Sequence, residues 1–103
     1  MTFRAEKEMI ESTLSIQIMG VMDYSTIDLF QIEIPENADK IKVDFSGLEF
    51  IDSTGIGAIL ILIYEARDRN KDIELAGLNH EVRELFETVG VFRIMEALRR
   101  GGR

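Results

Sequence analysis

The feature that most constrains the fold is the stretch 44–60, in which an apolar run, a group of small polar residues and a second apolar run follow one another. The polar group is the sequence Asp-Ser-Thr-Gly-Ile-Gly at residues 52–57. These residue types cap helices, accept phosphate or let another backbone approach closely. Two buried elements would therefore hold this group at an exposed turn.

The second apolar run can be interpreted as a strand or as a helix. Residues 56–64 are almost continuously apolar, and periodicity alone does not separate a buried strand from a buried helix. The isoleucines favour a strand. The run continues, however, without a break into the charged segment 65–69, and Ser53 or Thr54 can serve as its N-cap. We therefore predict three consecutive elements: a strand over 41–45, a loop over 52–57 and a helix over 54–69.

The rest of the chain alternates between strand and helix patterns. Residues 14–19 alternate cleanly between apolar and polar, as a half-buried strand does, and residues 3–10 do so more loosely. Asn79 can cap a helix that ends at Gly90 and has its apolar residues three and four positions apart. The other predicted elements are a short helix capped by Asp23 or Ser25 and ending before Pro35, a strand over 73–76, and a short helix or strand over 92–98.

This order of elements predicts a single α/β domain over residues 1–103. It would contain a mixed sheet of four or five strands with helices packed on it. Residues 1–10 are expected to lead with a strand that forms a hairpin with 14–19, and residues 96–103 to form a frayed tail. The loop over 52–57 would lie at the carboxyl ends of the strands, which is the usual functional edge of such a sheet.

The composition excludes several classes of function. The chain has no cysteine and a single histidine, His80, so neither a zinc cluster nor thiol chemistry is available, and we expect no metal site and no cofactor. A net charge of -7 repels nucleic-acid backbones, so nucleic-acid binding is not expected. Because no segment has the pattern of a membrane span or a signal peptide, we expect no insertion into a membrane and a cytoplasmic location.

Three kinds of chemistry fit the polar loop to different degrees. A phosphate cradle would use Gly55 and Gly57, but no third glycine follows and no Gly-Lys-Ser/Thr sequence is present. A nucleophilic Ser53 would lack one of the two glycines of a hydrolase elbow, and His80 would be its only imidazole base. A serine that accepts phosphate from another protein needs only an accessible hydroxyl at a helix N-terminus. The residues alone leave open a purely structural role, in which Ser53 and Thr54 cap the helix.

A longer pattern surrounds the Asp-Ser-Thr-Gly motif. It comprises Asp44-Phe-Ser-Gly-Leu-Glu-Phe-Ile-Asp-Ser-Thr-Gly-Ile-Gly-Ala-Ile-Leu60, the segment 14–20 followed by Asp23, the strand 73–76 followed by Gly77 and Leu78, and the segment 82–90. This pattern resembles that of STAS domains, specifically of bacterial anti-sigma factor antagonists. The chain departs from the family in the segment 23–44, which is short and contains Pro35.

The resemblance implies a phosphorylation switch. In that family the serine that follows the aspartate, here Ser53, is phosphorylated by an anti-sigma factor that is also a serine kinase. The unphosphorylated antagonist binds the kinase and releases the sigma factor, and a metal-dependent serine phosphatase reverses the modification. ATP and metal would then belong to the partners, while Asp23, Asp52, Thr54 and Gly55 would shape the surroundings of the phosphorylation site.

The helical wheel of the segment 54–69 adds a prediction about the partner surface. At about 100° per residue, one side of the helix gathers Ile56, Ile59, Leu60, Ile63 and Ala66. Outside that cluster, on the side towards Ser53, lie Gly57, Ile61 and Tyr64. We therefore predict that these three residues and Ser53 form the partner contact. The alternative is that a neighbouring loop or helix covers Ile61 and Tyr64.

The sequence thus predicts a phosphorylation-controlled binding protein that is not itself an enzyme. One alternative is a STAS subunit that serves as a docking piece in a transporter or in another signalling complex. A remote alternative from a different class is a small serine hydrolase that uses Ser53.

Overall fold

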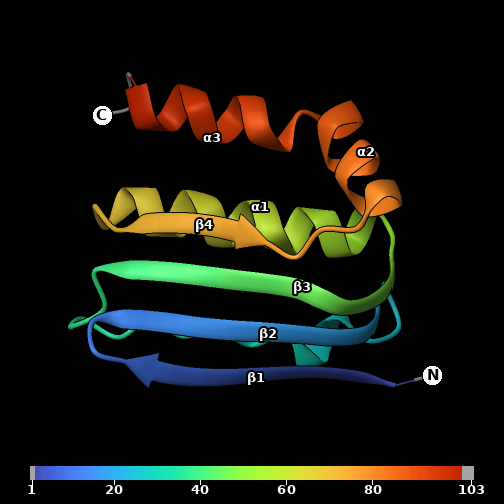
Figure 1. Ribbon diagram of the computed structural model, residues 1–103, viewed down its shortest axis with the longest axis horizontal. Coiled ribbons are helices and arrows are strands. Elements are labelled where there is room, and N and C mark those ends of the chain that lie inside the picture. The colour runs from blue at the N-terminus through green and yellow to red at the C-terminus, as the bar shows by residue number, and fades with distance from the viewer. Residues whose placement is uncertain (1, 101–103) are drawn as a thin grey trace.

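The strand and helix patterns produce a four-stranded sheet with helices packed against it (Figure 1). The computed structural model describes residues 2–100. Along this part of the chain the elements are β1 (Phe3–Ile10), β2 (Thr13–Met22), the 3-10 helix η1 (Ile27–Leu29), β3 (Lys40–Ile51), α1 (Ser53–Asp68), β4 (Asp72–Ala76), α2 (His80–Val89) and α3 (Val91–Arg100). Among the helices of residues 2–100, none combines the length and the apolar character needed to cross a membrane.

The strands lie in the order β1-β2-β3-β4. β1 and β2 form an antiparallel hairpin with a tight turn, in which Glu11 has a φ of 56°. β2, β3 and β4 are parallel neighbours. The structure therefore confirms the predicted α/β class with a mixed sheet and a leading hairpin, and the described residues contain four strands.

The core lies between one face of the sheet and α1. Ile16 and Ile18 of β2 are fully buried, and Gln17 between them is exposed, as the period of two requires. On the helix side, Ile59 and Ile63 are also fully buried. Burying side chains of this size contributes about 1.5–3 kcal/mol each. Because α1 contacts β3, β4 and η1, it lies on the same side of the sheet as the connection between β2 and β3.

The caps of α2 confirm the prediction for residues 79–90. The Asn79 side chain accepts a hydrogen bond from the N–H of Val82 at 2.8 Å, and Gly90 ends the helix with a left-handed φ of 94°. Phe86 of α2 packs edge-on against Phe45 of β3, with ring centroids 5.5 Å apart. After Gly90 the chain forms α3, so the helix rather than the strand is correct for the last predicted element.

The prediction for the start of α1 was wrong by one residue. Asp52 is the N-cap, because its extended backbone places the carboxylate against the N–H of Gly55 at 3.0 Å. Ser53 and Thr54 already belong to the helix. The predicted loop over 52–57 is therefore reduced to Asp52, and the rest of it forms the first turn of α1.

The short helix predicted after Asp23 is present only as the 3-10 helix η1, and its predicted caps were wrong. Asp23 and Ser25 cap no helix; the Asp23 carboxylate instead accepts hydrogen bonds from the N–H and the hydroxyl of Ser25, at 2.9 and 2.7 Å. These bonds close a local turn, which competes with helix formation. Only the three-residue η1 follows, and its N-cap Thr26 makes no side-chain cap bond.

Two other boundaries differ from the prediction. β3 continues past residue 45 to Ile51, because Leu48 and Ile51 are buried and the strand stays paired with β2 across two register shifts. α3 continues through residues 96–100, where a frayed tail was expected. Leu98 packs against the core. The Nε of Arg100 lies 3.4 Å from a carboxylate oxygen of Glu96, one helical turn earlier. Residues 101–103 lie outside the described part of the chain.

Candidate functional site

The candidate site is the turn at which β3 passes into α1. β3 ends at Ile51, Asp52 is the single connecting residue, and Ser53 is the first residue of α1. Ser53 and Thr54 are both exposed. The side-chain hydrogen bonds that hold this turn within residues 2–100 come to Asp52, and none involves the hydroxyl of Ser53. The serine hydroxyl is therefore presented to solvent rather than used in the fold.

Asp52 fixes the geometry around this hydroxyl. One carboxylate oxygen accepts from the N–H of Gly55 at 3.0 Å, and the other accepts from the N–H of Tyr24 at 3.2 Å. The N–H of Asp52 itself donates to the carbonyl of Met22 at 3.2 Å. The side chain therefore joins the first turn of α1 to the segment that follows β2, and brings Asp23 and Tyr24 to the edge of the site.

Asp23 adds a second fixed negative charge to this edge. Its carboxylate accepts the hydroxyl and the N–H of Ser25, and its own N–H donates to the hydroxyl of Thr26 at 3.0 Å. The hydrogen bond from the Ser25 hydroxyl is the main cause that lowers the pKa of Asp23 below its ordinary value, and its backbone bonds act in the same direction. Asp23 therefore stays ionised at neutral pH.

The two glycines of the motif have different environments. A Cβ atom at Gly55 would lie 2.7 Å from both Ile51 Cγ1 and the carbonyl oxygen of Met22, so the close approach of β2, β3 and α1 requires glycine there. A Cβ atom at Gly57 would meet nothing within 4 Å. Within the described chain, nothing in the fold demands glycine at position 57. That space lies one helical turn beyond Ser53, on the same side of α1.

The predicted apolar strip on α1 is open to solvent. Ile61 is 68% exposed and Tyr64 is 49% exposed, so no loop or helix among residues 2–100 covers them. The buried side of α1 comprises Gly55, Ile56, Ile59, Leu62, Ile63 and Ala66. Leu60, which was predicted to belong to it, is half-buried, and Leu62 is buried instead. The structure thus places Ser53, Gly57, Ile61 and Tyr64 on one free side of the helix.

Two exposed apolar residues near the site were missed by the sequence analysis. Tyr24 is 78% exposed beside Asp52, and Leu29 is 64% exposed on η1, which contacts α1. A periodic pattern cannot find them, because both lie in an irregular connection. The sequence signal that could have indicated them is the presence of an aromatic and an aliphatic residue in a segment otherwise rich in turn-forming residues.

The single histidine of the sequence, His80, lies on α2. It is largely exposed at the start of α2, and its Nε2 lies 3.4 Å from a carboxylate oxygen of Glu84. Within residues 2–100, no group of three or more histidine, cysteine, aspartate or glutamate side chains is placed to hold a metal ion.

The fold is that of a small α/β domain with a four-stranded mixed sheet, and comparison with known proteins identifies the family. The model of the STAS domain matches residues 4–100, so the chain belongs to the STAS domain family. An anti-sigma F factor antagonist from Paenibacillus polymyxa is 25% identical over 100 residues, which cover 92% of this chain and 86% of the relative.

Solved structures show the same fold. The anti-sigma factor antagonist SpoIIAA in its unphosphorylated form matches with a TM-score of 0.69 and 24% identity, over 87% of this chain and 82% of that chain. The Bacillus cell fate determinant SpoIIAA in its phosphorylated form matches with a TM-score of 0.65 and 22% identity, over 89% of this chain and 86% of that chain. This chain therefore has the fold of anti-sigma factor antagonists.

Proposed function

We propose that the protein is a phosphorylation-controlled binding module whose switch is Ser53. In its unphosphorylated form it binds an anti-sigma factor that is also a serine kinase, and thereby releases a sigma factor. Phosphorylation of Ser53 ends this binding, and a metal-dependent serine phosphatase restores it. The observation that carries the proposal is the exposed Ser53 hydroxyl, which makes no hydrogen bond within residues 2–100 although its neighbour Asp52 is fully engaged.

The electrostatics of the turn suit a phosphate. Phosphorylation adds about -1.5 to -2 charges, and a helix N-terminus stabilises such charge. The first N–H groups of α1 have no intrahelical acceptor, and Asp52 occupies only that of Gly55. A phosphate at Ser53 can therefore be accommodated with little refolding. The change that a partner meets is a local gain of negative charge beside Asp52 and Asp23.

The partner surface that we propose is the free side of α1. It consists of Ser53, Gly57, Ile61 and Tyr64. Around the axis of α1 these residues lie on one side, opposite the buried side of the helix. Large apolar residues that stay exposed in a folded chain mark interaction surfaces when they adjoin one another. The relatives support this proposal, because they include an anti-sigma F factor antagonist and SpoIIAA in its unphosphorylated and phosphorylated forms.

The direct test is phosphorylation by the cognate anti-sigma factor kinase with ATP, followed by intact mass and peptide mapping. We expect one added phosphate, located on Ser53, and loss of kinase binding after modification. Ser53→Ala should remove the phosphate, whereas the control Thr54→Ala, at the adjacent exposed hydroxyl, should keep it. An unmodified protein that instead associates stably with a transporter component would contradict the proposal and support the docking alternative. Ester turnover that depends on Ser53 would support a hydrolase.

A second variant tests the docking surface. Ile61→Asp places a charge in the middle of the strip and should lower the affinity for the kinase by at least tenfold without unfolding the chain, because residue 61 is 68% exposed. Val89→Asp is the matched control, since Val89 is also an exposed apolar residue, 46% exposed on α2. Calorimetric titration gives the affinities. Equal affinities for both variants would show that the strip is not the contact.

A further inference from the structure

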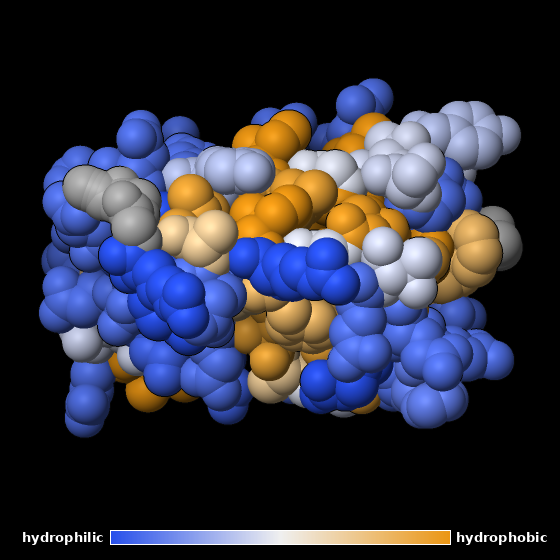
Figure 2. Space-filling model, turned by 90° about the horizontal axis from the view of Figure 1, so that it is seen from above, coloured by the Kyte–Doolittle hydropathy of each residue, from blue (hydrophilic) through white to orange (hydrophobic). Residues whose placement is uncertain are grey.

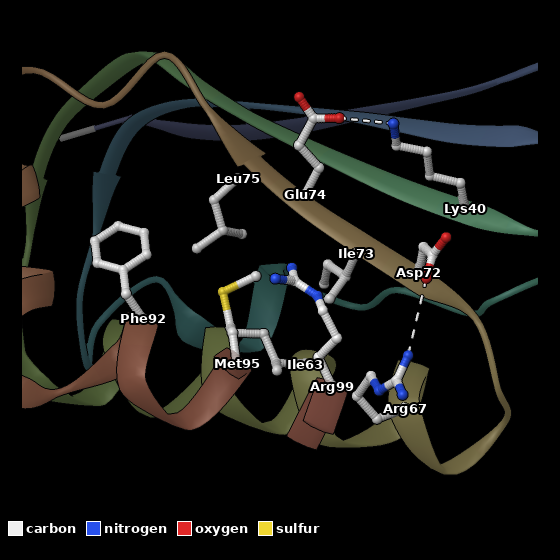
Figure 3. Close-up of a pocket in the computed structure, with 10 residues that line it drawn as sticks. All are labelled: Lys40, Ile63, Arg67, Asp72, Ile73, Glu74, Leu75, Phe92, Met95 and Arg99. Atoms are coloured by element: carbon white, nitrogen blue, oxygen red, sulfur yellow. Dashed lines mark ion pairs between the residues drawn. The ribbon is translucent and has the colours of Figure 1, made fainter. Parts of the chain in front are cut away.

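The last helix leaves a cavity beside the edge of the sheet. α3 follows α2 through the left-handed Gly90, and Val91 is its only fully buried residue. The inward side chains Phe92, Met95 and Leu98 are only partly buried. Between α3, α1 and β4 the structure has a cavity of about 610 Å³ (Figure 3). That volume lies within the range of about 300–1,000 Å³ typical of small-molecule sites.

One wall of this cavity is apolar. It is formed by side chains of α1, β4 and α3, namely Ile63, Ile73, Leu75, Phe92 and Met95. Seen from the α3 side, hydrophobic residues are exposed in the middle of this face and hydrophilic residues flank them (Figure 2). Because the hollow is open to solvent, an apolar occupant would remove the exposed parts of this wall from water.

The polar rim of the cavity carries three basic side chains that differ in how closely they are paired. Lys40 is neutralised, because its ammonium lies 2.8 Å from the carboxylate of Glu74. Arg67 is held by two longer contacts: one guanidinium nitrogen lies 3.8 Å from a carboxylate oxygen of Asp72, and the other donates to the carbonyl of Leu98 at 3.4 Å. Its Nε is buried without a hydrogen-bond partner among the described residues. The second arginine, Arg99, lies about as far from its nearest carboxylate as Arg67 lies from Asp72.

Arg99 extends from α3 over the apolar wall. In Figure 3 its guanidinium is drawn between the end of the Met95 side chain and Ile73, and its nearest carboxylate, that of Glu96, is 4.0 Å away. The rim thus holds three cations, Lys40, Arg67 and Arg99, and two acids, Asp72 and Glu74. The carboxylate of Glu96, outside the rim, lies against Arg99.

We propose that this cavity is a binding site for a small amphipathic anion. A carboxylate or phosphate head group would accept hydrogen bonds from Arg67 and Arg99, and an apolar chain or ring would lie on the wall of Ile73, Leu75 and Met95. The site is distinct from Ser53, because Arg67 lies fourteen residues further along α1, which is about 20 Å at 1.5 Å per residue. It does not depend on the phosphorylation switch.

The test uses octanoate as the probe and 1-octanol as its neutral counterpart, with amide chemical shifts as the readout. We expect octanoate to shift the signals of Ile73, Leu75 and Met95 and to leave those around Ser53 unchanged. Because hydrogen bonds to charged groups are strong, Arg99→Met should weaken octanoate binding by about tenfold or more and leave 1-octanol binding unchanged. Arg100→Met is the matched control on the same helix, and it should bind octanoate like the parent chain.

Three results would overturn the proposal. The first is the absence of octanoate-dependent shifts at these residues up to the solubility limit. The second is equal octanoate affinity in the Arg99→Met and Arg100→Met variants. The third is retention of binding in Leu75→Trp, which fills the cavity with a larger side chain, at unchanged circular dichroism. Both arginine variants lie on the exposed end of α3, so their folding is not in question.

Discussion

The substitution Gly57→Ala should raise the stability of the fold and lower the affinity for a partner. Gly57 lies in the interior of α1, and a Cβ atom there would meet nothing within 4 Å. Glycine in a helix costs about 0.8–1 kcal/mol relative to alanine, and no clash offsets this difference. The variant should therefore raise the free energy of unfolding by about 0.5–1 kcal/mol. At about 4–8 °C per kcal/mol for a domain of this size, the melting temperature should rise by about 2–8 °C.

The same methyl group should weaken partner binding. It projects into the open space one turn beyond Ser53, on the side of α1 that we propose as the docking surface. A partner seated against that surface would have to withdraw from the methyl group, and we expect a loss of at least about tenfold in affinity, equivalent to about 1.4 kcal/mol. Stability and affinity would then change in opposite directions.

Gly55→Ala is the matched control two residues away. There the new methyl group would collide with Ile51 and with the backbone of Met22, so overpacking should cost about 1–3 kcal/mol despite the gain in helix propensity. Urea denaturation followed by circular dichroism gives the stabilities, and calorimetric titration of unphosphorylated protein with the kinase gives the affinities. A Gly57→Ala protein that is more stable and binds the kinase with unchanged affinity would refute the reasoning.

Two further predictions concern stability. Lys71 is buried and donates to the carbonyls of Ala38 and Glu36 at 2.6 and 3.0 Å, so Lys71→Met should lower the free energy of unfolding by about 1–3 kcal/mol; an unchanged urea midpoint would contradict this. Hydrogen bonds from Ser46 lower the pKa of Asp44 below its ordinary 3.8; the bond from the backbone N–H has the larger effect and the bond from the hydroxyl the smaller. The stabilisation of the fold by ionised Asp44 is complete above the unfolded-state pKa and is lost as the pH falls through the lower folded-state pKa. Asp44→Asn should therefore reduce the loss of stability at acid pH. Urea denaturation at neutral and at acid pH measures this decline in the free energy of unfolding. An equal decline in the parent chain and in Asp44→Asn would contradict the prediction.

The parts of the fold that depend on neighbouring residues could be predicted from the sequence. The helix from His80 to Val89 was predicted because Asn79 and Gly90 act on the chain next to them. The hairpin and the strand at 73–76 follow from short-range alternation. Ser53 was predicted as the phosphorylation site because the Asp-Ser-Thr-Gly motif is itself local, although the residue that caps the helix is Asp52.

The parts that depend on distant contacts could not be predicted. The continuation of β3 to Ile51 depends on pairing with β2 across register shifts, which the interrupted alternation around Gly47 does not indicate. The exposure of Ile61 depends on the absence of a covering element, and only the structure shows that a short η1 lies beside α1. The cavity under α3 depends on the separation between β4 and the side chains of Met95 and Arg99. A helical wheel gives the angles around one helix and does not give the distance to another element.

The two hydrogen bonds of Asp52 bear on the phosphorylation switch that we propose at Ser53. They hold the carboxylate between the N–H groups of Gly55 and Tyr24, so the proposed phosphate would add its charge to one that keeps its place. Nothing needs to move for a partner to tell the two forms apart. Recognition would then be carried by charge at the surface, which mobile ions screen over about 8 Å at physiological ionic strength. The ratio of the affinities of the two forms should therefore shrink as salt is added, whereas a switch based on rearrangement would keep it.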